Sequence, residues 1–71
     1  MRRIGAHRII TGSATLLQAV VEISDDRVVN YYEFRGELPM TEWLGGTITI
    51  GRDDDGILRA WKDGVLLTDD D

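Results

Sequence analysis

Residues 16–24 (LLQAVVEIS) alternate apolar and polar side chains, which is the pattern of a half-buried β-strand. The apolar side of this alternation carries Leu17, Ala19, Val21 and Ile23. Asp25 and Asp26 follow, and aspartate favours tight turns because it tolerates left-handed backbone and bonds its own main chain. Residues 27–35 are then rich in β-branched and aromatic side chains, as strands are. The sequence therefore predicts a β-hairpin over residues 16–35.

The alternation does not decide which face of residues 27–35 is buried. One face would carry Val28, Tyr32 and Phe34, and the other would carry Val29 and Tyr31. The two sets are comparably apolar. Because adjacent strand residues point to opposite faces, Tyr31 and Tyr32 cannot both face a core, and the pair is a candidate contact surface.

Further strand-like runs lie outside this hairpin, at residues 3–10, 47–50, 57–61 and 65–68. Asp63 and Gly64 supply the left-handed turn that a tight hairpin needs between the last two. Parallel pairing needs a crossover of about a dozen or more residues, usually a helix, and the sequence shows none. We predict an all-β fold of about six short antiparallel strands, a small sandwich or a partly open barrel.

Residues 36–46 (GELPMTEWLGG) are the one segment without a strand pattern. Pro39 suits a first helical turn and Gly45 suits a C-cap, so we predict one helical turn near residues 40–44. The segment also carries three large apolar side chains, those of Met40, Trp43 and Leu44. They either close one open end of the barrel or form a contact patch of the kind that tryptophan anchors.

The chain has 71 residues, which is enough for one domain; we assign it to residues 1–68 and treat residues 69–71 as an acidic tail. A domain of this size holds about 4–10 kcal/mol of net stability. The chain has no cysteine, so no disulfide can add to that. The stability must come from a compact core, with or without self-association.

The net charge of −5 is unevenly distributed. Residues 1–35 carry five arginines against four acids, a net of +1, and residues 36–71 carry three basic residues against nine acids, a net of −6. Seven of those nine are aspartates between positions 53 and 71. An acidic chain is a poor ligand for nucleic acid or anionic membranes, since both need clustered Lys and Arg.

No constellation of residues predicts catalysis, a metal or a cofactor. Asp53 and Asp55 resemble the start of a calcium loop, but Ile57 and Gly64 occupy positions that need oxygen ligands. His7 is the one histidine, and the chain has no thiol. Glu33, Glu37 and Glu42 are interpreted as separate surface carboxylates. The sequence therefore predicts a protein that is not an enzyme.

No stretch approaches the ~18–20 apolar residues of a membrane span. Met1, Arg2 and Arg3 precede the uncharged run 9–21 as in a signal peptide, but polar residues interrupt that run. We therefore expect a cytoplasmic protein.

Three runs resemble the small N-terminal β domain, or composite domain, of amidohydrolase-superfamily enzymes: AHRIITG, LLQAVVEISDDRVVNYYEF and WLGGTITI, within residues 4–50. In that family a hairpin of the form VxIxDGRI precedes a metal-binding barrel, and residues 20–29 resemble the hairpin. The family's first barrel strand carries a His-x-His pair, whereas residues 47–71 contain no histidine, so no catalytic residue carries over. The chain is also similar to short uncharacterised bacterial β proteins.

These observations lead to two functional hypotheses. The first is a non-enzymatic binding or assembly module that contacts an unknown protein partner, or a second copy of the chain, through Trp43, Met40, Leu44, Tyr31 and Tyr32. The second, which the resemblance implies, is an accessory domain or subunit of a metal-dependent hydrolase.

Overall fold

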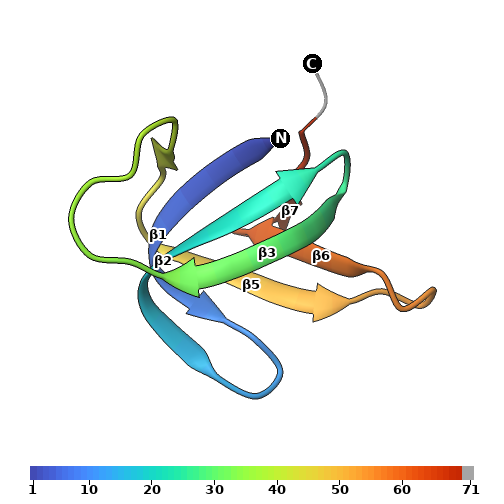
Figure 1. The fold of residues 1–71 in the computed structure, drawn as a ribbon. Coiled ribbons are helices and arrows are strands. Elements are labelled where there is room, and N and C mark those ends of the chain that lie inside the picture. Colours follow the sequence, from blue (N-terminus) through green and yellow to red (C-terminus); the bar gives the residue numbers. More distant parts are fainter. Residues whose placement is uncertain (70–71) are drawn as a thin grey trace.

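The computed structural model describes residues 1–69, which form one curved β-sheet and no helix (Figure 1). The predicted all-β class is confirmed. In chain order the strands are β1 (Arg2–Ile10), β2 (Thr15–Ser24), β3 (Arg27–Glu33), β4 (Glu42–Trp43), β5 (Thr47–Arg52), β6 (Leu58–Lys62) and β7 (Val65–Leu66).

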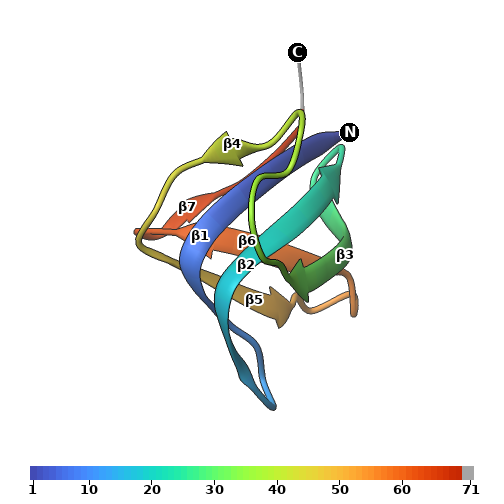
Figure 2. The same ribbon diagram turned by 60° about the vertical axis from the view of Figure 1, so that its left-hand side comes forward.

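The sheet has the order β3-β2-β1-β5-β6-β7, and β4 also pairs with β1 (Figure 2). It curls without closing, so that β3 packs against β6 across the opening. Arg59 on β6 spans this opening: its Nη1 donates a hydrogen bond to the Asp26 carbonyl oxygen, 2.7 Å away, and its Nε lies 2.9 Å from Asp53 Oδ2. The structure therefore has the form of a partly open barrel.

Strand direction departs from the prediction at β1. This strand runs parallel to both β4 and β5, whereas all other pairs are antiparallel. The sheet was expected to be mostly antiparallel, and the two parallel pairs are the exception: residues 34–46 cross from β3 to the far side of β1 without a helix. A crossover of that length does not require a helix.

Both predicted aspartate turns are present. Asp25 has a φ of 58° between β2 and β3, and Asp63 and Gly64 have φ values of 53° and 81° between β6 and β7. The turn chemistry of the sequence thus places both hairpins correctly. Of the three residues predicted as an acidic tail, Asp69 pairs with Asp25 and its carboxylate lies 2.9 Å from the amino terminus, while residues 70 and 71 lie outside the described part.

The concave side of the sheet holds an aliphatic core. It is formed by Ile4, Ala6, Ile9, Ala19, Val21, Ile23, Val28, Ile48, Ile50, Ala60 and Leu67. These side chains come from five strands and the segment after β7, so burying them fixes the curvature of the sheet. At roughly 25 cal/mol per Å² of apolar surface, this burial is the main source of stability.

An irregularity in the β1–β2 ladder changes which residues face the core. The pairing omits His7 and Gln18, and Gln18 has a φ of 51°. On the N-terminal side of Gln18, the partly buried side chain of Leu16 packs on the core, whereas Leu17 is 61% exposed. The prediction that Leu17 shares the core face with Ala19 was wrong, because the left-handed residue between them breaks the period of two.

A β-bulge settles the orientation of β3. The register with β2 shifts between Glu22 and Ile23, so that Val28 pairs with Ile23 but Tyr31 pairs with Val21. Both partners are core residues, and Val28 and Tyr31 therefore lie on the core side three positions apart. The core side of β3 therefore carries Val28 together with Tyr31, whereas the sequence alternation had placed these two residues on opposite faces.

The predicted helical turn near residues 40–44 is wrong. Met40 has a φ of 59°, which is outside the right-handed helical region, and residues 42–43 are the short strand β4. The backbone N–H of Leu44 donates to the Gly5 carbonyl oxygen, at 3.0 Å, instead of to its own segment. The hydrogen bonds of β1 thus replace those that a helical turn would have made.

Candidate functional site

Residues 34–46, which we call the covering segment, lie across the face of β1 and β2 opposite the core, the outer face. Pairing between β4 and Ile4–Gly5 holds one end. Arg3 Nη1 donates to the Pro39 carbonyl oxygen at 3.1 Å, and Arg2 Nε lies 2.6 Å from Glu42 Oε2. The segment is therefore attached through main-chain and charged hydrogen bonds.

Trp43 packs directly on the glycine of β1. A Cβ atom added to Gly5 would lie 2.6 Å from Trp43 Cε3, closer than real contacts allow. Gly5 and Val20 are buried although they face away from the core. The glycine at position 5 thus makes room for the indole on the outer face.

Two further rings fix the orientation of the indole. The His7 ring is 5.0 Å from the Trp43 ring between centroids and almost perpendicular to it, and the Phe34 ring is 6.2 Å away at an interplanar angle of 78°. Edge-to-face packing of this kind is favourable beyond the area it buries. Trp43 is nevertheless 48% exposed, so part of an ordered indole remains open to solvent.

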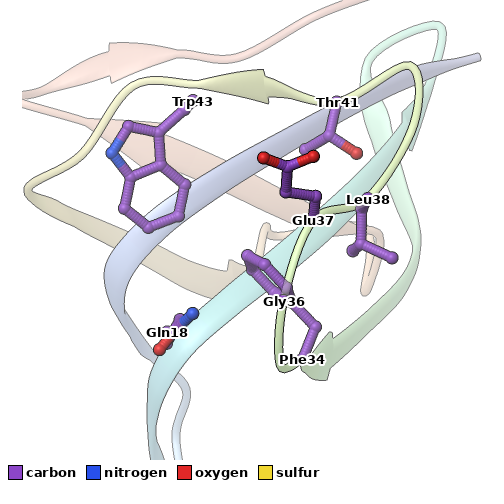
Figure 3. A pocket seen from close by; sticks show the side chains of 7 residues that line it. All are labelled: Gln18, Phe34, Gly36, Glu37, Leu38, Thr41 and Trp43. Atoms are coloured by element: carbon purple, nitrogen blue, oxygen red, sulfur yellow. The ribbon is translucent and has the colours of Figure 1, made fainter.

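The indole forms one wall of an open groove of about 450 Å³, which we call the Trp43 groove (Figure 3). Its lining consists of Gln18, Phe34, Gly36, Glu37, Leu38, Thr41 and Trp43. Figure 3 shows the Glu37 carboxylate between the indole and Leu38. Within residues 1–69 this carboxylate has no ion pair or hydrogen-bond partner. The groove therefore combines aromatic walls with a free negative charge.

Backbone strain accompanies the groove. Gln18, on its floor, and Met40, in the covering segment, both have left-handed φ values, of 51° and 59°. Such a conformation costs a side-chain-bearing residue about 1–2 kcal/mol, and neither residue is an aspartate in a hairpin turn as Asp25 and Asp63 are. Strain of this kind is often found at binding sites.

A polar cluster on the same outer face borders the covering segment. Glu22 Oε2 accepts a hydrogen bond from the Tyr32 hydroxyl at 2.7 Å and one from Arg3 Nε at 3.1 Å. The hydrogen bond to Glu22 and the burial of the phenol raise the pKa of Tyr32 above its ordinary value. Arg3 thus links this cluster to the covering segment through Pro39.

The structure does not gather all the residues predicted as a contact site. Trp43 lines the groove, whereas Leu44 is 41% exposed beside it and Met40 is 91% exposed at the bend of the segment. Tyr32 is bonded to Glu22 on the outer face. Tyr31 lies on the core side, where it lines a separate cavity of about 380 Å³ at the open edge of the barrel, with Leu58.

Sequence reasoning missed most of the groove, namely Gln18, Phe34, Glu37, Leu38 and Thr41. One signal was available, since Phe34 continues the alternation of Tyr32 and so shares the outer face. Gly5 in the middle of an otherwise regular strand was a second signal, because such a glycine often marks the close approach of another group.

No family model, curated protein or solved structure was found to match the chain. Residues 1–69 contain no cluster of acidic and histidine side chains arranged to hold a metal ion. The same residues form no helix that is long and apolar enough to cross a membrane.

Proposed function

We propose that this protein is a non-enzymatic binding module that holds a segment of a partner protein in the Trp43 groove. One observation carries the proposal: the indole of Trp43 is half-exposed, yet it is held in a fixed orientation by Gly5, His7 and Phe34. A side chain that is already ordered loses little conformational entropy when a partner covers it.

The dimensions and chemistry of the groove support this function. Its volume of about 450 Å³ falls in the range of ordinary binding sites, about 300–1,000 Å³. It is open on one side, which suits a chain segment better than an enclosed small molecule. Tryptophan is also among the residues that most often dominate binding energy at protein interfaces.

Selection from a random peptide phage library tests the proposal. We expect selected peptides to bind Trp43→Ala at least about tenfold more weakly, because the substitution removes a hot-spot side chain. Val65→Ala is the control, since Val65 is 65% exposed on β7 and is not among the residues that line the groove. Peptides that bind the unsubstituted protein, Trp43→Ala and Val65→Ala equally tightly would contradict the proposal.

Two measurements separate a lost contact from a lost fold. Urea unfolding of Trp43→Ala should show the cooperative transition of a folded domain, and Trp43→Phe should retain part of the binding because a ring still covers Gly5. Sedimentation equilibrium tests whether the partner is a second copy of the chain. If the protein is a dimer and Trp43→Ala dissociates it, the second copy occupies the groove. If the dimer persists in Trp43→Ala, its interface lies elsewhere.

A further inference from the structure

The charge of the Trp43 groove indicates the chemistry of its occupant. Glu37 is a carboxylate without a partner in the described part of the chain, and it lines the groove beside two aromatic rings. Aromatic faces attract cations through their quadrupole, and a carboxylate attracts them through its charge. The rings of Phe34 and Trp43 meet edge to face at an interplanar angle of 78°, and Trp43 is still 48% exposed, so part of the aromatic surface beside Glu37 stays open to a cation.

The two arginines that attach the covering segment already have partners. Arg2 is paired with Glu42, and Arg3 is paired with Glu22 and bonded to Pro39. Arg35 lines the neighbouring cavity with Glu33 rather than the Trp43 groove. Neither Arg35 nor the exposed Arg8 makes an ion pair with Glu37 within residues 1–69, so the carboxylate stays available to a cation of another molecule, and the net charge of −5 favours the approach of that cation.

We propose that the Trp43 groove binds an arginine side chain of the partner protein; this rests on the proposed function and specifies its ligand. The planar guanidinium stacks on an aromatic ring and has five N–H donors in a fixed fork. The groove offers acceptors for them: the Glu37 carboxylate, the Gln18 side-chain carbonyl and the Thr41 hydroxyl oxygen. A methylated ammonium has few or no N–H groups for these acceptors.

Four capped pentapeptides, identical except for the central residue, test this assignment by NMR titration of the Trp43 indole N–H. The central residues are arginine, citrulline, lysine and trimethyl-lysine. Citrulline is the matched neutral control, since it keeps the shape of arginine and loses the charge. We expect the arginine peptide to bind about 5- to 30-fold more tightly than the citrulline peptide, as one cation–π contact and one exposed ion pair allow.

Two protein variants locate the effect. Glu37→Gln should lower the preference for arginine over citrulline to the part that the cation–π contact supplies, because it removes the ion pair inside the groove and leaves the aromatic rings in place. Asp54→Asn removes the same charge from the exposed turn after β5 and should leave the preference unchanged. If Glu37→Gln and Asp54→Asn lower the preference for arginine equally, the peptide is attracted by the net charge alone, and the assignment is overturned.

The peptide results also separate this inference from the proposed function. Equal binding of arginine and citrulline peptides, or tightest binding of lysine or trimethyl-lysine, would overturn the arginine assignment. So would phage-selected peptides that depend on Trp43 but lack arginine, and these would leave the binding module standing. A selection that yields no Trp43-dependent peptide would overturn both.

Discussion

The strand pair β1–β2 is covered on both faces, but by different chemistry. On the core side Ile4, Ala6, Val21 and Ile23 are fully buried under aliphatic side chains from β3, β5 and β6. On the outer face a single connection, the covering segment, lies over Gly5 and leaves Trp43 half-exposed, and Val20 is buried on the same face. One sheet thus has one face that is closed and one that remains accessible.

The closed core face holds the strands of the sheet together, whereas the outer face keeps large side chains accessible to solvent. The core joins strands that are far apart in sequence, so loss of any contact weakens the whole sheet. The covering segment is attached at β4, through Arg2 and through Arg3, and it carries two of the strained or strongly exposed residues, Met40 and Trp43. Segments with few buried contacts open at lower free-energy cost than the core.

The largest expected effect is on the core face. Ile23→Ala should lower the free energy of unfolding by about 2–5 kcal/mol, because it deletes buried methyl groups and leaves a cavity. Leu17→Ala, on the same strand, should cost no more than about 0.5 kcal/mol, since Leu17 is 61% exposed. Urea unfolding measures both. Equal losses of unfolding free energy in the two variants would mean that Leu17 faces the core as Ile23 does, so that the alternation of β2 continues unbroken through Gln18.

A somewhat smaller effect is expected on the outer face. Gly5→Ala should destabilise the protein by about 1–3 kcal/mol, because the new methyl group collides with the indole of Trp43. In a Trp43→Ala background the same substitution should cost much less, since the colliding ring is gone. A double-mutant cycle by urea unfolding measures the coupling, and an equal cost in both backgrounds would contradict the contact.

The sequence predicts the core face better than the outer face, for physical reasons. The period of two identifies Ala19, Val21 and Ile23, and the aspartate turns fix both hairpins, because these signals depend on neighbouring residues. The period fails at Gln18 and at the β3 bulge, where one residue of unusual conformation reverses the side on which the following residues lie. No pattern of side chains announces either irregularity.

The candidate site depends on contacts between segments distant in sequence. Trp43 was identified as a contact residue from its type and its place outside the strands. Its packing on Gly5 joins positions 38 residues apart, and the free carboxylate of Glu37 is apparent only once the partners of Arg2 and Arg3 are known. Local propensity favoured a helical turn, and pairing with β1 overrode it.

The smallest effect concerns the polar cluster that borders the covering segment. The hydrogen bond to Glu22 raises the pKa of Tyr32 above its ordinary value of about 10. Because the folded protein holds this proton more tightly than the unfolded chain, the associated stability is fully present below about pH 10 and is lost as the pH rises through the higher, folded-state pKa. Glu22→Gln should therefore bring the Tyr32 pKa back toward its ordinary value.

Absorbance of the tyrosinate in a Tyr31→Phe background isolates the titration of Tyr32. Glu42→Gln is the matched control, because Glu42 is bonded to Arg2 and not to the phenol. We expect this variant to leave the Tyr32 titration unchanged. If Glu22→Gln also leaves the Tyr32 titration unchanged, the phenol is not bonded to Glu22. The outer face would then lack this part of its polar cluster.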